Sequence, residues 1–207
     1  MDFVHPVRAV IPGVQGRVLA VLAETTADLN LRTLARLAGV SVAQASRVMP
    51  DLVELGLVER HEVPPSSQFR LNHENVAAQA ILDLARSRDT AMHRIGFAAN
   101  SLSVPPVSII VFGSLARGEA DSQSDLDAVV VRPDETAEDD DAWAAEVERW
   151  RSEARAITGN RVEVLEVSHH EVRARLDGNA TLWRDIVRDG VTVYGLTIDE
   201  LVEPLHA

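Results

Sequence analysis

Apolar residues in the first third of the chain follow a helix, turn, helix pattern. From residue 14 to 24 they recur at helical spacing, which predicts an amphipathic helix. Asn30 is placed to cap a second helix, LRTLARLA, and Ser41 to cap a third, VAQASRVMPDLVEL. Gly39 and Gly56 interrupt the pattern after these two segments. The pattern predicts three helices separated by short turns.

Two short strands are predicted to follow these helices. LVERHE (57–62) and SQFRLN (67–72) flank Pro64-Pro65 and predict a two-stranded ribbon. Pro50 lies inside the third predicted helix, and it should kink or split that helix because it has no N–H and its ring crowds the preceding turn. Residues 74–100 predict one long helix or two shorter ones, which would serve as a connector and as a surface for a homodimer.

The second half of the chain alternates between strand and helix patterns. Four apolar runs predict strands: VSIIVF (107–112), DLDAVVV (125–131), RVEVLEV (161–167) and VTVYG (191–195). Between them, a short helix is expected after Ser114. A longer helix has Trp143 and Trp150 on one face and ends at Gly159, and a further one lies at 183–187. The expected fold class is α/β (α+β), in two domains, with a small mixed sheet flanked by helices in the second.

The order of elements in the first half is similar to the winged helix-turn-helix family. The resemblance covers residues 10–72 and is carried by LRTLARLAGVSVAQASRVMPDLVELGLVER. It implies that the helix starting near Ser41 enters the DNA major groove, with Ser41, Gln44 and Arg47 as the DNA-binding positions. However, residues 1–75 hold 7 Arg and 8 Asp or Glu, a weak charge balance for binding phosphates. The alternative is a module for dimerisation or protein contact.

Two aspartates interrupt the start of an apolar strand. Side chains alternate along a strand, so Asp125 and Asp127 should face the same side, with Cα atoms about 6.5–7 Å apart. Their carboxylates repel each other unless cations lie between them, and two divalent metals suit such a pair. Upstream, Gly113 allows close approach of a ligand, and Ser114 is expected to cap a helix whose N–H groups face a phosphate.

This stretch resembles the signature of the DNA polymerase beta superfamily of nucleotidyltransferases, in its minimal nucleotidyltransferase branch. Gly113-Ser114 is followed by ten residues, 115–124, and then by Asp125-Leu126-Asp127. The resemblance implies that the two aspartates bind two Mg²⁺ ions as catalytic and metal residues. It also implies that Gly113 and Ser114 hold the phosphates of a nucleoside triphosphate, ATP in the first instance.

The family usually adds a third carboxylate on a later strand, as a metal ligand and helper in deprotonating the acceptor. Glu163 is expected to fill that role, because a charge within a valine run is costly unless it is used or solvated. Glu166 is the alternative, although it faces the opposite side of its strand. Arg117 and Ser124 are further nucleotide-binding candidates by the same resemblance, and Arg117 could equally be a surface residue.

These observations predict three regions: a winged helix-turn-helix domain at 1–73, a connecting helix at 74–102 and a nucleotidyltransferase domain at 103–207. The expected activity is transfer of AMP from ATP to a hydroxyl of a protein or small-molecule acceptor. Members of the resembled family include antitoxins that adenylylate a HEPN-type toxin, which makes such a toxin a candidate protein partner. The alternative function is a DNA-binding transcriptional regulator whose second domain is a sensor or scaffold.

Composition adds several exclusions. The 207 residues contain no cysteine, which excludes disulfides and thiolate metal sites. There is no apolar run long enough to predict a membrane span, and the N-terminus lacks a signal-peptide pattern, so a cytoplasmic protein is expected. The formal charge is −12, and residues 133–146 hold seven acids. That acidic segment is expected to be a solvated loop and helix start, and it could attract a basic partner.

Overall fold

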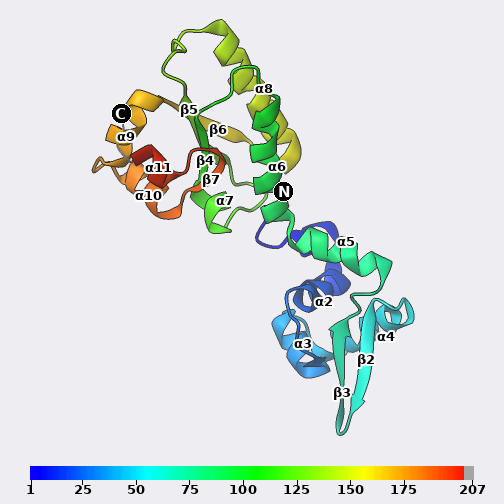
Figure 1. Cartoon of the computed structure of the whole chain (residues 1–207). Helices are drawn as coiled ribbons and strands as arrows, with labels where there is room; N and C mark the ends of the chain where they lie inside the picture. The colour runs from blue at the N-terminus through cyan, green and yellow to red at the C-terminus, as the bar shows by residue number, and fades with distance from the viewer. Residues whose placement is uncertain (203–207) are drawn as a thin grey trace. The chain divides into compact units, whose positions relative to one another are not determined.

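The computed structural model describes residues 1–202 and divides into two compact units. The first unit consists of Asp2 and Val4–Ser87, and the second of Met1, Phe3 and the described residues from Arg88 onward. Figure 1 shows both units with their helices and strands labelled. The proposed nucleotidyltransferase domain, 103–207, includes five residues, 203–207, that lie outside the described part of the chain.

The first unit is built from helices and one small antiparallel sheet (Figure 1). Its helices are α1 (Pro6–Val10), α2 (Gly13–Ala23), α3 (Leu31–Leu37), α4 (Val42–Glu54) and α5 (Val76–Ala85). Its strands are β1 (Leu29–Asn30), β2 (Val58–Val63) and β3 (Ser66–Leu71), in the order β1-β3-β2. The predicted helix, turn, helix and ribbon are therefore confirmed, each within about two residues of its expected bounds.

The predicted helix caps form as expected. Asn30 Oδ1 accepts a hydrogen bond from the Thr33 N–H at 2.9 Å, at the start of α3. At the start of α4, Ser41 Oγ accepts from the Gln44 N–H at 3.1 Å, and Gln44 Oε1 accepts from the Ser41 N–H at 2.9 Å. This reciprocal pair satisfies two backbone donors that the helix itself leaves open.

The sequence predicts that Pro50 kinks or splits its helix, but the helix is not split. Helix α4 runs from Val42 to Glu54 with Pro50 inside it. The neighbouring side chains Met49 and Leu52 are both buried in the core of the unit, while Pro50 itself is exposed. Burial of an apolar face stabilises a helix more than local propensity does, so packing on either side of Pro50 maintains the helix.

The second unit is a four-stranded mixed sheet between helices (Figure 1). Its strands are β4 (Ser108–Phe112), β5 (Leu126–Arg132), β6 (Val162–Ser168) and β7 (Val191–Gly195). Its helices are α6 (Ser87–Ala98), η1 (Ala99–Ser101), α7 (Gly113–Arg117), α8 (Asp141–Thr158), α9 (His169–Leu176), α10 (Thr181–Asp189) and α11 (Ile198–Val202). The strand order is β6-β5-β4-β7, with β5 and β6 parallel and the other pairs antiparallel.

Alternation along the strands assigns each side chain to one of two apolar layers. On one face, Val111 and Val130 pack with Ile95 of α6 and with Trp143 and Trp150 of α8. The other face has its own apolar cluster, whose members are Ile110, Val129, Val131, Val167, Val172, Leu176, Trp183, Ile186 and Leu201, from the sheet and from α9, α10 and α11. The tryptophans are therefore core residues, as their helical spacing predicted.

The 74–100 segment contains two helices, α5 and α6, followed by the short η1 turn. The division between the two compact units falls at Ser87 and Arg88, where α6 begins. Among the helices of residues 1–202, none combines the length and apolar character needed to cross a lipid bilayer.

Candidate functional site

Gly113 lies directly against the carboxylate of Asp127. The preceding residue, Phe112, is the strand partner of Asp127 where β4 pairs with β5. Gly113 has a φ of +72°, and a Cβ atom on it would lie 2.5 Å from Asp127 Oδ2. The left-handed conformation favours glycine here, and a Cβ would force the Asp127 carboxylate to move. The Gly-Ser turn and the second aspartate of the sequence signature are thus in contact.

The expectation that Ser114 caps the next helix is wrong. Helix α7 begins at Gly113, its N-cap position is Phe112, and no side chain makes a capping hydrogen bond there. The left-handed turn at Gly113 leads from β4 directly into the helix, which places Ser114 within the first turn instead of before it. The first N–H groups of α7 therefore have no side-chain acceptor.

The two aspartates differ in their surroundings. Asp125 is exposed and comes immediately before β5, whereas Asp127 lies inside the strand and is half-buried. Glu163 of β6 is paired in register with Asp127, so their side chains leave the same face of the parallel pair. The structure brings Asp127 and Glu163 together on neighbouring strands, with Asp125 two residues before Asp127.

Glu166, the alternative third carboxylate, lies elsewhere. It is paired in register with Val130, whose side chain belongs to the layer under α6 and α8. Its Oε1 accepts a hydrogen bond from Arg132 Nε at 2.7 Å. Glu166 therefore faces away from Asp127 and already forms an ion pair with Arg132.

The negative charge of Asp127 is poorly compensated. Burial raises the pKa of Asp127, and the nearby charges of Asp125 and Glu163 raise it further, while Arg117 acts in the opposite direction. Oε1 of Glu163 is shielded from solvent and has no hydrogen bond, although the Arg161 guanidinium lies within ion-pair distance. The charge of Glu163 is thus compensated by Arg161, and the uncompensated charge of the site is that of Asp127.

Carboxylate oxygens are the ligands that Mg²⁺ prefers, so the chemistry of these three side chains fits that ion. In residues 1–202, however, no three Asp, Glu or His side chains are arranged as a ready-made metal site. The Glu163 carboxylate is paired instead with the Arg161 guanidinium. The three acids are neighbours whose oxygens do not converge on one point.

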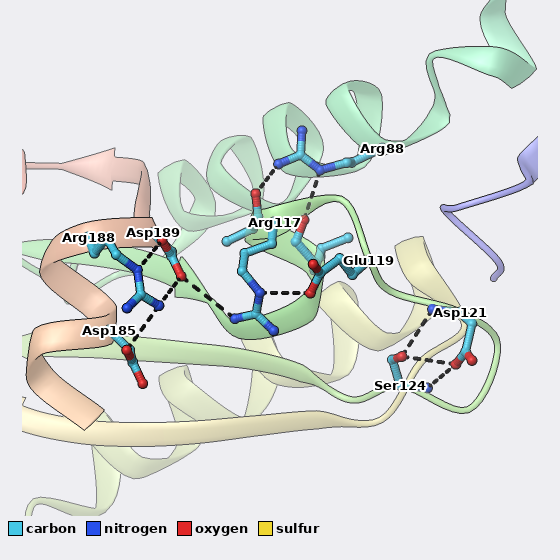
Figure 2. A network of polar contacts seen from close by, with 10 residues as sticks. Arg88, Arg117, Glu119, Asp121, Ser124, Asp185, Arg188 and Asp189 are labelled. Carbon is cyan, nitrogen blue, oxygen red and sulfur yellow. Dashed lines mark hydrogen bonds and ion pairs between the residues drawn. The ribbon is translucent and has the colours of Figure 1, made fainter. Parts of the chain in front are cut away.

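Arg117, the last residue of α7, belongs to a network of charged side chains shown in Figure 2. Its Nε donates to Glu119 at 2.8 Å, and its guanidinium lies 3.9 Å from Asp189 of α10. Arg188 makes two hydrogen bonds to Asp189, which lower the pKa of that carboxyl group. Arg117 thus lies between a loop carboxylate and one at the end of α10, close enough to Asp127 to influence its ionisation.

Arg88 is a residue that the sequence analysis missed. From the start of α6, its Nε donates to the Leu115 carbonyl at 2.8 Å, and its guanidinium also binds the Ala116 carbonyl (Figure 2). These carbonyls belong to α7, so Arg88 anchors the short helix that follows the Gly-Ser turn. No local pattern marks this arginine, because its partners are backbone atoms 27 and 28 residues away.

Ser124 has a role in the loop that precedes Asp125. Its hydroxyl accepts a hydrogen bond from the Asp121 N–H and donates one to Asp121 Oδ1 (Figure 2). Asp121 Oδ1 also accepts from the backbone N–H groups of Gln123 and Ser124, and these contacts lower the pKa of Asp121. The loop is therefore closed on itself by one aspartate and one serine.

The DNA-binding candidates are split by the cap of α4. The side-chain oxygens of Ser41 and Gln44 accept the hydrogen bonds of the reciprocal cap, whereas Arg47 is exposed one turn further along the helix. Next to them is a hollow of about 930 Å³ lined by residues of α3, α4 and the β2–β3 ribbon, Val42, Ser46 and Pro50 among them. The exposed surface of α4 thus has a polar stripe with Arg47 and a more apolar stripe beside the ribbon.

Comparisons with known proteins match each half of the chain separately. Residues 98–177 match the family model described as a nucleotidyltransferase domain, and residues 16–62 match the IclR helix-turn-helix domain. No curated protein matches the chain. The first match spans the Gly-Ser turn, both aspartates and Glu163.

Two solved structures are distantly similar. One is described as "Crystal structure of the toxin-antitoxin with AMP-PNP" and is 15% identical to this chain. The match covers 54% of this chain and 80% of that chain, with a TM-score of 0.38. The other, a MarR family transcriptional regulator from Silicibacter pomeroyi DSS-3, is 26% identical. It covers 42% of this chain and 65% of that chain, with a TM-score of 0.33.

Proposed function

We propose that this chain, which joins an IclR-type helix-turn-helix domain to a nucleotidyltransferase domain, transfers a nucleoside monophosphate from a triphosphate to an acceptor hydroxyl. ATP is the proposed donor and a divalent cation, Mg²⁺, the proposed cofactor. The acceptor would be a hydroxyl of a protein, such as a HEPN-type toxin, or of a small molecule.

One observation carries the proposal. The Gly113 backbone lies against Asp127, and Glu163 is the in-register neighbour of Asp127 on the next strand. A glycine turn with open N–H groups next to acidic side chains suits a triphosphate together with cations that neutralise it. The match to a nucleotidyltransferase domain over residues 98–177 includes all of these positions.

Asp125, Asp127 and Glu163 would hold the metal ions. Mg²⁺ bound there would neutralise the phosphate charge and favour ionisation of the acceptor hydroxyl. The raised pKa of Asp127 supports this assignment, because it indicates a carboxyl group that gains from positive charge.

The chain's own residues would then bind and orient the reactants. Backbone N–H groups of Gly113 and Ser114 would contact the β- and γ-phosphates, and Arg117 would exchange Glu119 for a phosphate oxygen. Glu163 would help to take the proton from the acceptor hydroxyl, whose oxygen would attack the α-phosphorus in line. The bond from that phosphorus to the bridging oxygen would break, releasing pyrophosphate. Most of the rate enhancement would come from this positioning.

Calorimetric titration of the full chain with ATP, with and without Mg²⁺, tests the proposal. We expect metal-dependent binding that is lost in Asp125→Asn and Asp127→Asn, and weakened in Glu163→Gln. Glu166→Gln is the matched control, because it removes a similar carboxylate from the same strand on the opposite face. If none of the four common ribonucleoside triphosphates binds the wild-type chain, the proposed activity is wrong.

The acceptor can be sought once binding is established. ATP labelled at its α-phosphate would be incubated with the protein and candidate acceptors, a HEPN-type toxin and small hydroxyl compounds separately. Transfer of label that requires Asp125 would identify the acceptor class. Label that moves equally with the Asp125→Asn variant would exclude the proposed site as its source.

A second proposed function is DNA binding through α4. The match to an IclR helix-turn-helix domain over residues 16–62 and the exposed position of Arg47 favour it. In that case Arg47→Ala should reduce retention of duplexes selected from a random pool by about 10–100-fold, the loss expected for one base-contacting arginine. Asp127→Asn should leave DNA retention unchanged. No selection of any duplex by the wild-type chain would exclude this function.

A further inference from the structure

Asp125 is exposed, yet its backbone is held on both sides. The carbonyl of the preceding residue, Ser124, accepts a hydrogen bond from Asn160 Nδ2 at 2.7 Å. The N–H of the following residue, Leu126, donates to the Arg161 carbonyl at 2.7 Å. Two consecutive residues just before β6 thus hold the two peptide groups that flank Asp125.

Asn160 is one of the few buried polar residues of the structure, with a relative exposure of 5%. Its second amide hydrogen is donated to the Asp121 carbonyl at 3.0 Å, and its Oδ1 accepts from the Met1 ammonium group at 2.7 Å. The side-chain amide therefore spans the loop from Asp121 to Ser124 and uses both of its donors on it. Its own N–H donates to Thr158 Oγ1, which orients the residue from the end of α8.

The loop is also internally closed, by the paired hydrogen bonds between Asp121 and Ser124. That closure sets the shape of the loop but does not attach it to the sheet. On the Ser124 side of Asp125, attachment comes from Asn160, because its amide links two loop carbonyls to the segment that leads into β6, the strand that carries Glu163. On the other side, the backbone bond from Leu126 to the Arg161 carbonyl and the β5–β6 ladder hold the chain, so Asn160 is the side chain that fixes the loop end of Asp125.

We propose that Asn160 is a positioning residue for Asp125, and that it sets the affinity of the carboxylate site for a divalent cation. The inference rests on the proposed function of that site. Asn160 would act without touching cation or nucleotide, by holding the Ser124 carbonyl and hence the Asp125 backbone. Residues that orient metal ligands in this way typically contribute 10–100-fold to metal affinity.

Asn160→Asp is the sharpest variant. It preserves the side-chain volume and the acceptor toward Met1, but replaces the two donated hydrogens with an oxygen that faces two carbonyls. Asn160→Ala is the second variant, and it removes the clamp without adding a charge. Trp150→Phe is the matched control, because it removes the buried hydrogen bond from Trp150 Nε1 to the Ile95 carbonyl in the same unit and leaves the loop intact.

Two measurements distinguish positioning from general destabilisation. The first is amide hydrogen exchange at Gln123, Ser124 and Leu126 in the metal-free protein. We expect faster exchange at these amides in both Asn160 variants and not in Trp150→Phe. The second is Mn²⁺ binding in the presence of ATP, followed by electron paramagnetic resonance, with an expected loss of about 10–100-fold in Mn²⁺ affinity in the Asn160 variants. Binding should recover at saturating Mn²⁺.

The outcomes are separable. If the wild-type chain binds Mn²⁺ and ATP and both Asn160 variants bind equally well, the inference is wrong and the proposed function stands. If Trp150→Phe weakens Mn²⁺ binding as much as the Asn160 variants do, the effect is destabilisation and the inference is also wrong. If the wild-type chain binds neither ligand, the proposed function fails and the inference fails with it.

Discussion

The contact between Gly113 and Asp127 makes the backbone itself part of the site. Gly113 has a φ of +72°, and the Asp127 carboxylate lies where a Cβ atom on Gly113 would be. The turn can therefore approach a ligand bound at Asp127 without obstruction. This close approach depends on Gly113 and on Asp127, which is the strand partner of the residue just before Gly113.

Gly113→Ala should be more damaging than an alanine at an equally left-handed glycine elsewhere. Gly13, the first residue of α2, has φ of +81° and open space around it, so Gly13→Ala should cost only the conformational strain of about 1–2 kcal/mol. Gly113→Ala should cost the same strain and in addition about 0.5–1.5 kcal/mol, because its Cβ forces the end of the Asp127 side chain away from its preferred rotamer. Urea unfolding of both variants measures the difference, and equal losses would contradict the crowding argument.

The same Asp127 should destabilise the ligand-free protein near neutral pH. Burial, Asp125 and Glu163 raise the pKa of Asp127 when the chain folds. Below the ordinary pKa of aspartate the group is protonated in both states and makes no difference. Between the ordinary pKa and the raised folded-state pKa, the unfolded chain is ionised while the folded protein is still protonated, so the free energy of unfolding falls as pH rises. Above the raised pKa the carboxyl group is ionised in both states, and the loss of stability is complete.

Asp127→Asn removes this charge and should raise the free energy of unfolding of the ligand-free protein near neutral pH. The gain should shrink as pH falls toward the ordinary pKa of aspartate, about 4. Urea unfolding of both proteins at about pH 4 and about pH 7.5 checks the sign. A destabilised variant at neutral pH would mean that Asp127 makes favourable contacts that outweigh its desolvation.

At the scale of single elements, α4 contains an internal proline, and packing of the helix against the core offsets the loss of helix stability that the proline causes. Pro50 cannot donate the hydrogen bond that the Ser46 carbonyl would accept in a regular helix, and both residues line the hollow beside the ribbon. The helix nevertheless continues to Glu54, since Met49 and Leu52 are buried. An element can thus be formed by its apolar face despite a strong local breaker.

Pro50→Ala should therefore stabilise the protein. Proline is about 3 kcal/mol less favourable than alanine within a helix. Part of this gain is offset by up to about 1 kcal/mol, because alanine gives the unfolded chain more freedom. A net gain of about 2 kcal/mol is expected in chemical unfolding, whereas Ala43→Gly on the exposed surface of the same helix should lose about 1 kcal/mol. No gain from Pro50→Ala would mean that the helix has adapted to proline.

On the scale of the whole molecule, the chain contains two compact units with separate apolar cores. One core is centred on residues such as Leu22, Leu34 and Leu71, and the two layers of the other unit lie on either side of its sheet. Each unit therefore has its own source of stability. A ligand that binds one unit should stabilise that unit first.

Scanning calorimetry should accordingly show two thermal unfolding transitions, one for each unit. Mg²⁺ and ATP should raise the midpoint of only one, by the equivalent of about 2.7 kcal/mol at a ligand concentration 100 times Kd. Hydrogen exchange should locate the added protection in α7, the 120–126 loop and the start of β6. A single transition that shifts as a whole would show that the two units unfold cooperatively.

The sequence predicted the elements well wherever local chemistry specifies them. Asn30 and Ser41 began their helices, Gly159 ended α8, and strand β7 had the expected bounds. It was wrong about Ser114, and the split that was one expected outcome at Pro50 does not occur. The turn at Gly113 starts α7 two residues early, and the core maintains α4 across the proline.

The sequence by itself determined which residue types the candidate site contains: a glycine turn, two aspartates at a set spacing and a glutamate in a valine-rich strand. These follow from alternation and turn chemistry, which act over a few residues. Only the tertiary structure decided that Glu163 and not Glu166 neighbours Asp127, because strand register is set between segments that are 36 residues apart. The same holds for Arg88 and Asn160, whose partners are distant backbone carbonyls that leave no trace in local sequence.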